Sequence, residues 1–124
     1  MMFKCTGKLL YYPTWWLILK VDEDVCRYYR KLIHFYNRSL RLNPSKNDGH
    51  ITILAGKYEK PVNKMLWGKY EGDKIEFSYN TEIKNDDEYY WMAVQCKRIE
   101  EIRLELGLNP TIKWPWHLTI GNLK

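Results

Sequence analysis

Two four-residue segments of this chain follow one pattern, in which a histidine and a threonine alternate with two apolar residues. They are residues 50–53 (His-Ile-Thr-Ile) and residues 117–120 (His-Leu-Thr-Ile). Side chains alternate between the two faces of a β-strand. A strand with this pattern therefore presents its histidine and threonine on one face and buries two aliphatic side chains on the other. The pattern predicts two half-buried strands, each with an imidazole beside a hydroxyl.

The repetition of the pattern carries more weight than either copy. About half of all residues are apolar and about one in twenty is threonine, so a histidine has this context by chance about one time in a hundred. The chain has three histidines, and two of them have it. A single copy would be an ordinary half-buried strand histidine. Two copies that face each other would surround one small anion, an arrangement suited to acid–base chemistry at phosphorus.

Cleavage of a phosphodiester without a metal needs a base, an acid and donors to the non-bridging oxygens. Two imidazoles, whose ordinary pKa is about 6.5, can divide the two proton transfers. Threonine hydroxyls can donate hydrogen bonds to the phosphoryl oxygens. We therefore expect His50, Thr52, His117 and Thr119 to be the catalytic residues. Which histidine is the acid stays open.

The doubled H-x-T motif resembles the signature of the two-histidine phosphoesterase superfamily, in which each motif lies on a central strand of one lobe. The resemblance implies a two-lobed α+β fold in which antiparallel sheets face a central cleft, with the helices outside. It also implies metal-independent cleavage of cyclic nucleotides, cyclic oligonucleotides or short RNA ends. The small size and the bare two-motif core look similar to the phage-encoded branch, whose members degrade the cyclic oligonucleotide signals of bacterial defence.

Hydrophobic periodicity and turn residues predict the order of the elements. Strands are expected at residues 8–12, 15–21, 50–55, 74–79, 89–96 and 117–120. Helices are expected from residue 22 to about residue 42 and at residues 98–106, and residues 57–69 are expected to be irregular or to form a short helix. The order strand, helix, turn and motif strand thus occurs twice, within a single domain that spans residues 1–124.

The second predicted helix is amphipathic. Its apolar side is expected to hold Ile99, Ile102, Leu104 and Leu106, and Gly107 is expected at its C-terminal cap. His34 lies within the first predicted helix but off its apolar stripe, so it is expected to be a surface or partly buried residue. Trp114 and Trp116 would point to the face opposite that of His117 and Thr119 if the alternation of the last strand extended to them. Both are therefore expected in the core. The acidic residues 86–88 are expected to form a solvated turn.

The charge is unevenly distributed along the chain. Residues 1–70 contain 13 Lys and Arg against 5 Asp and Glu, and residues 71–124 contain 7 against 10. A basic half in a chain with 15% aromatic residues suits a polyanionic partner with stackable bases, although a solvated charged face explains it equally well. We expect Tyr12, Lys57 and Tyr58 to bind substrate. Tyr58 would share the face of Thr52 if the strand continued that far.

Cysteine use and hydropathy bear on the compartment. Cys5, Cys26 and Cys96 are odd in number and lack C-x-x-C spacing, which indicates a reducing compartment and argues against a disulfide framework or a zinc thiolate site. The pairing of each motif histidine with threonine argues against a metal, so no cofactor is expected. No apolar run has the length of a membrane span. We expect a cytoplasmic protein (in the host cytoplasm if it is viral) with no membrane partner, and with a nucleotide or short oligonucleotide as its substrate.

Three questions stay open from the sequence. Only four residues follow Ile120, so a lid over the second motif would come from residues 57–69, from the N-terminal segment or from a second subunit. The oligomeric state is unknown. The same cleft could also belong to a catalytically silent nucleotide binder, or the basic half to an RNA-binding module.

Overall fold

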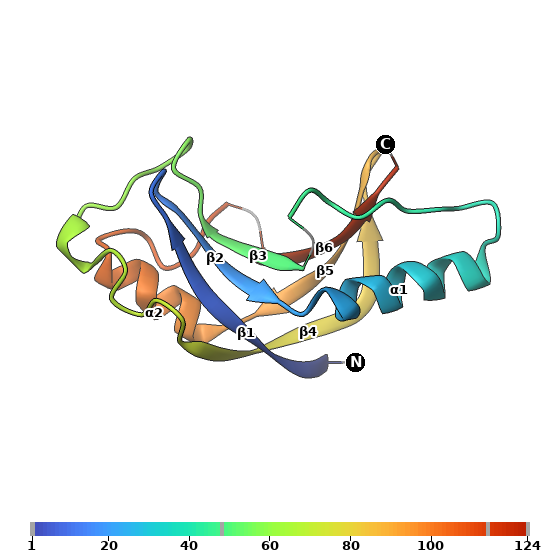
Figure 1. Cartoon of the computed structure of the whole chain (residues 1–124), viewed down its shortest axis with the longest axis horizontal. Helices are drawn as coiled ribbons and strands as arrows, with labels where there is room; N and C mark the ends of the chain where they lie inside the picture. The colour runs from blue at the N-terminus through green and yellow to red at the C-terminus, as the bar shows by residue number, and fades with distance from the viewer. Residues whose placement is uncertain (1, 48, 114, 124) are drawn as a thin grey trace.

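The computed structural model describes residues 2–47, 49–113 and 115–123. Within these residues the chain forms six strands, two α-helices and one short 3-10 helix (Figure 1). The strands are β1 (Met2–Tyr12), β2 (Trp16–Val21), β3 (His50–Leu54), β4 (Lys74–Asn85), β5 (Tyr89–Gln95) and β6 (His117–Asn122). The helices are α1 (Glu23–Tyr36), α2 (Lys97–Glu105) and the 3-10 helix η1 (Lys64–Leu66).

All six strands belong to one antiparallel sheet in the order β3-β2-β1-β4-β5-β6. The two outer strands, β3 and β6, also contact each other, so the sheet bends until it nearly closes (Figure 1). The expected α+β class and the antiparallel pairing are confirmed. The two strands that carry the H-x-T motifs are the two ends of the strand order.

One face of this sheet is apolar and forms the core. The register places Leu9 opposite Leu19, Leu19 opposite Ile51, and Met92 opposite Leu118. Each of these side chains is fully buried, which contributes about 1.5–3 kcal/mol per residue. A slip by one residue would turn all of them to the other face, so the burial fixes the register. It thereby also fixes which face carries the polar residues of the motifs.

The helices cover the apolar face in an exchanged arrangement. α1 follows β2 in the chain but packs against β6, and α2 follows β5 but packs against β3. Each helix thus supports the motif strand of the other half of the chain. The two halves share one core for this reason.

The prediction that the first helix reaches residue 42 is wrong, because α1 ends at Tyr36. Asn37 leaves the helical conformation, and its side-chain oxygen accepts hydrogen bonds from the backbone N–H and the hydroxyl of Ser39. Such local bonds compete with the helix and favour a turn. Leu42, whose spacing suggested a longer helix, packs against the core from the loop instead.

The apolar side predicted for the second helix is wrong at one position. Leu104 is 55% exposed, whereas Arg103 is only 1% exposed. The guanidinium of Arg103 is buried because it finds several oxygen acceptors, which are described below. Gly107 directly follows the helix cap with a φ of 83°, the left-handed conformation expected of a C-terminal glycine.

β1 and β4 are longer than predicted. β1 begins at Met2 rather than residue 8, and β4 runs to Asn85 rather than residue 79. The additional residues of β1 pair with β4, and those of β4 pair with β5. Cross-strand partners, which a local pattern does not reveal, extend both strands. The short helix expected within residues 57–69 is η1, and the remaining limits differ by one or two residues.

Candidate active site

The first motif forms β3. Ile51 and Ile53 are buried in the core. His50 and Thr52 lie on the opposite face of the sheet and are half-buried. Lys20 of β2 lies directly opposite His50 on this face. The alternation expected for this motif is therefore present.

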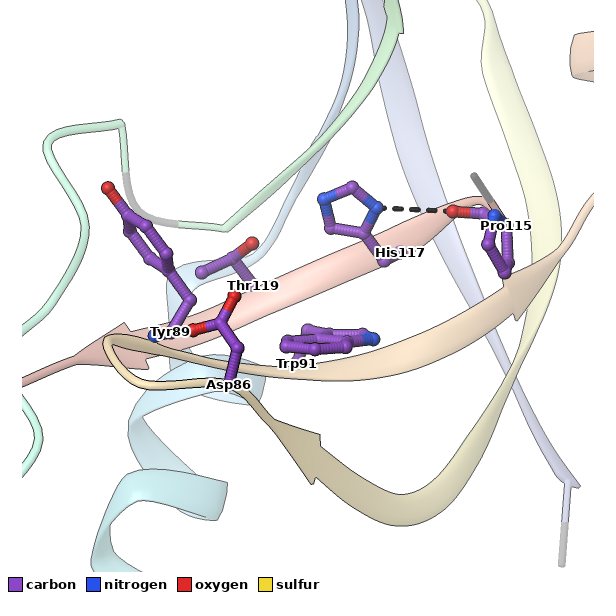
Figure 2. A pocket seen from close by; sticks show the side chains of 6 residues that line it. All are labelled: Asp86, Tyr89, Trp91, Pro115, His117 and Thr119. Carbon is purple, nitrogen blue, oxygen red and sulfur yellow. Dashed lines mark hydrogen bonds between the residues drawn. The ribbon is translucent and has the colours of Figure 1, made fainter. Parts of the chain in front are cut away.

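The second motif forms the start of β6 and has the same alternation. Leu118 and Ile120 are fully buried. Thr119 is half-buried and His117 is exposed, and both rise from the same side of β6 (Figure 2). Trp91 of β5 lies directly opposite Thr119. Through the strand register, both motifs present their histidine and threonine on the face of the sheet opposite the core.

Each motif strand contains a β-bulge at the fourth position of its motif. In β3 the residue skipped by the pairing with β2 is Ile53. In β6 the residue skipped by the pairing with β5 is Ile120. A bulge bends a strand and re-aims the neighbouring side chains, and bulges are common beside active sites. Both bulges directly follow the threonine of the motif.

Two helix arginines bond the carbonyl groups of the bulged residues. Nη1 of Arg103 in α2 donates to the carbonyl oxygen of Ile53 at 2.9 Å. Nη1 of Arg30 in α1 donates to the carbonyl oxygen of Ile120 at 2.7 Å. A buried carbonyl that a bulge removes from the strand ladder needs another donor, and the arginines supply it. The two motif strands are therefore held in the same way.

Arg103 also connects the first motif to the segment that precedes the second. Its Nε donates to the carbonyl oxygen of Asn109 at 2.8 Å, and its Nη1 contacts the carboxylate of Glu59. The guanidinium lies over the ring of Trp116, 5.7 Å from the centroid. The prediction that Trp116 packs in the core is confirmed, since its side chain is buried. No local sequence signal distinguishes Arg103 from a surface arginine.

The structure brings three of the four motif side chains to pockets that meet at His117. One pocket is lined by Thr52 and His117, together with Tyr58 and part of the segment 109–113. A second pocket is lined by His117 and Thr119 (Figure 2). His50 lies beside Thr52 on the same strand face but is not among the described residues that line either pocket.

The hydrogen bonds of the two histidines have the same form. Nδ1 of His117 lies 3.2 Å from the carbonyl oxygen of Pro115 (dashed line in Figure 2), and Nδ1 of His50 bonds the carbonyl oxygen of Asn47. A carbonyl oxygen can only accept, so in both rings Nδ1 carries the proton. In the neutral ring the lone pair is then on Nε2. Both imidazoles are held in the same tautomer by backbone that precedes their strand.

A tryptophan from the neighbouring strand contacts each histidine ring edge to face. Trp16 of β2 lies 5.6 Å from His50, and Trp91 of β5 lies 6.5 Å from His117, between ring centroids. Such contacts fix the plane of the imidazole without using its nitrogen atoms. Neither tryptophan was predicted as part of the site, although both lie in predicted strands.

The three predicted substrate-binding residues have different positions. Tyr12 packs on Trp16 with a centroid distance of 5.0 Å, so it belongs to an aromatic series that leads to His50. Tyr58 is exposed and lines the pocket with Thr52, although β3 ends at Leu54 and the assumed continuation of the strand is wrong. Lys57 lines neither pocket, and its ammonium group lies 4.9 Å from the centre of the Tyr58 ring.

Other predicted residues are also placed. His34 is half-buried, its Nδ1 lies 3.0 Å from the carbonyl oxygen of Leu40, and it lines neither pocket. Trp114 lies outside the described residues. Residues 86–88 form the expected turn between β4 and β5, but Asp86 also lines the pocket of His117. The sequence did not predict that Asp86 lines this pocket, because no local pattern shows which strand lies beside the turn.

Three lysines follow His50 across the sheet in one row. Lys20 lies opposite His50, Lys8 lies opposite Lys20, and Lys74 lies opposite Lys8. Directly opposed like charges destabilise a sheet. Lys8 and Lys74 have no ion pair with a described acidic residue. The row gives this side of the site a positive potential that suits a polyanion.

Within the described part of the chain, no three His, Cys, Asp or Glu side chains are grouped so that they could hold a metal ion. None of its helices combines the length and the apolar character needed to cross a bilayer.

No family model, no curated protein and no solved structure matches this chain.

Proposed function

We propose that the protein is a metal-independent phosphodiesterase that uses the two histidines as general acid and general base. One observation carries the proposal: two H-x-T strands, far apart in the sequence, contact each other, and residues of both motifs, Thr52 and His117, line one pocket. A chance repeat of a strand pattern would not require its two copies to meet.

The residues supply every group that the reaction needs. The Nε2 of one neutral histidine takes a proton from water or from a ribose 2′-hydroxyl, whose oxygen then attacks phosphorus. The other histidine, protonated, gives its proton to the leaving oxygen as the P–O bond breaks. Thr52 and Thr119 donate hydrogen bonds to the non-bridging oxygens, on which charge develops. Water opening a 2′,3′-cyclic phosphate follows the same steps.

The repeated support of the motif strands favours a fold of two lobes related by a pseudo-twofold axis, as in the two-histidine phosphoesterases. Each motif strand has a bulge at the same position, an arginine on the bulged carbonyl and a tryptophan beside the histidine. In this arrangement the substrate phosphate lies between β3 and β6. The lysine row and the aromatic residues favour cyclic nucleotides, cyclic oligonucleotides or short RNA ends as substrates, including signals of nucleotide-based antiviral defence.

The test is hydrolysis of nucleoside 2′,3′-cyclic phosphates, cyclic dinucleotides and cyclic trinucleotides, with products identified by mass spectrometry. We expect turnover by the wild-type protein and its loss in His50→Ala and in His117→Ala. The double variant is expected to be hardly slower than either single one, because the two residues act as a unit. The matched control is His34→Ala, which removes the histidine outside the site and should leave the rate unchanged.

Three results would contradict the proposal. Near-wild-type turnover by either motif variant would exclude the two-histidine mechanism. Binding of a nucleotide without any turnover would instead indicate a silent binder that uses the same pockets. Affinity for RNA that falls steeply with salt, without product, would indicate an RNA-binding module.

A further inference from the structure

The pocket beside the second motif has a composition that the phosphodiesterase reaction does not require. It has a volume of about 590 Å³ and is lined by Asp86, Tyr89, Trp91, Pro115, His117 and Thr119. Pockets of about 300–1,000 Å³ are typical of small-molecule sites. Apart from the motif residues it offers two aromatic rings, a proline and one carboxylate (Figure 2).

The Trp91 ring gives this pocket a flat wall next to His117 and Thr119. Trp91 lies directly opposite Thr119 across the β5–β6 ladder, and Tyr89 lies two residues away on the same strand face. In Figure 2 the Trp91 ring lies below His117, with Asp86 beside it on the left. Stacking of a nucleobase on such a ring is worth about 1–3 kcal/mol. The wall therefore suits a base attached to the phosphate at His117.

The carboxylate of Asp86 is fixed in this pocket by its own turn. Its Oδ1 accepts hydrogen bonds from the backbone N–H groups of Tyr89 at 2.7 Å and Glu88 at 2.8 Å. These bonds hold the pKa of the Asp86 carboxyl below its usual range, so the group is ionised and can only accept hydrogen bonds. Its Oδ2 has no hydrogen bond or ion pair to any residue that the structure describes.

A carboxylate at this place disfavours a second phosphate and favours hydrogen-bond donors. We propose that the pocket binds a guanine base, which stacks on Trp91 and donates its N1–H and its 2-amino group to Asp86. This inference rests on the proposed function only in placing the scissile phosphate at His117 and Thr119. It makes Asp86 a specificity-determining residue.

Guanine fits because of the order of groups along its Watson–Crick edge. It presents two adjacent donors, N1–H and the 2-amino group, which can converge on one carboxylate oxygen. Adenine and cytosine each present an amino group next to an acceptor nitrogen, whose lone pair would face the negative charge. Uracil presents one N–H between two carbonyl oxygens. A fixed acceptor therefore matches the edge of guanine, and it repels an acceptor atom on the edge of adenine, of cytosine and of uracil.

The first test uses the wild-type protein and needs no turnover. Equilibrium affinities are measured by calorimetry for the 3′-monophosphates of guanosine, adenosine, cytidine, uridine and inosine. Guanosine 3′-monophosphate should bind about 10- to 100-fold more tightly than the others, the range for hydrogen bonds to a charged group. Inosine lacks only the 2-amino group and should already lose most of this preference. Equal affinity for all five nucleotides would overturn the assignment.

The second test replaces the carboxylate with its isosteric amide. Asp86→Asn keeps an oxygen for the two backbone N–H groups but points an NH₂ donor at the base, so the guanine preference should disappear. Asp87→Asn is the matched control: it removes the same charge from the same turn, and Asp87 does not line the pocket. A guanine preference that survives in Asp86→Asn would contradict the proposal. A guanine preference without hydrolysis would contradict the phosphodiesterase and leave the guanine site standing.

Discussion

Arg103 and Arg30 show how single side chains allow an irregular strand to be buried. At each bulge the carbonyl of the skipped residue accepts a hydrogen bond from one guanidinium nitrogen, which satisfies its need for a donor. Arg103 also bonds Asn109 and Glu59. A lysine offers a single charged nitrogen in place of this planar fork of donors and would not satisfy the same set.

Arg103→Ala should lower the free energy of unfolding by about 3–5 kcal/mol, because it leaves buried oxygen atoms without a donor. Arg98→Ala is the control on the same helix, where a 40% exposed side chain makes surface ion pairs, and it should cost less than about 1 kcal/mol. Urea denaturation measures both. Equal losses of unfolding free energy in the two variants would show that the buried hydrogen bonds of Arg103 stabilise the protein no more than the surface ion pairs of Arg98.

The motif threonines belong to the same scale. Thr52→Val and Thr119→Val keep the shape and the strand preference and remove only the hydroxyl. Each should lower kcat by about 10- to 1,000-fold, the range for loss of one donor to a developing oxyanion. Thr6→Val, on β1 and outside both pockets, is the control and should leave kcat unchanged. Full activity in both motif variants would reduce the threonines to ordinary strand residues.

At the scale of the elements, the strands show what a local pattern determines and what it does not. Alternation predicted the faces of β3 and β6, and the structure places their apolar residues in the core as expected. The bulges and the extension of β1 and β4 depend on partner strands, so no local window contains them. The end of α1 depends on one competing side chain, Asn37, in a run whose apolar spacing continues.

The row of lysines is expected to lower the free energy of unfolding measurably, through charge repulsion between β2, β1 and β4. Lys8→Gln removes the central charge, which faces Lys20 and Lys74, and should raise the free energy of unfolding by about 0.2–1 kcal/mol. The gain should shrink in high salt, since exposed charges are screened. Lys4→Gln is the control on the same strand: Lys4 pairs with Glu76, so no gain is expected. Chemical denaturation at two salt concentrations decides between these outcomes.

At the scale of the whole molecule, the α+β class could be predicted from the order of periodic segments. The closure of a single sheet, which brings β3 against β6, could not be predicted, because it depends on the order in which the six strands pair. The candidate site follows the same division. The four motif residues and Tyr58 were proposed from the sequence, whereas Asp86, Tyr89 and Trp91 required the pairing of β5 with β6. The catalytic role of the four residues stays a prediction.

The two-histidine mechanism predicts how activity depends on metal and pH. In the proposed mechanism the acid and the base are both imidazoles, so turnover should survive excess EDTA and need no added Mg²⁺, Mn²⁺ or Zn²⁺. The rate should follow a bell in pH around neutrality, because one ring must be neutral while the other is protonated. Rates measured across pH, with and without EDTA, test both points. Loss of activity on chelation, restored by a divalent ion, would show that a metal does the work assigned to the histidines.

The position of the motifs at the two ends of the strand order has a consequence for motion. Among the described strands, β3 and β6 each pair with one other strand, so β3 can open without breaking a second ladder, and β6 would break in addition only the isolated bridge between Asn122 and Asn43. A ligand that contacts both motifs would hold β3 and β6 together along their contact, the seam of the sheet. It would therefore raise the free energy needed to open either strand. Amide hydrogen exchange should then slow on nucleotide binding in β3 and β6 more than in β1 and β4. Uniform slowing across all six strands would mean that the ligand tightens the sheet as a whole, and that the seam opens no more readily than the rest.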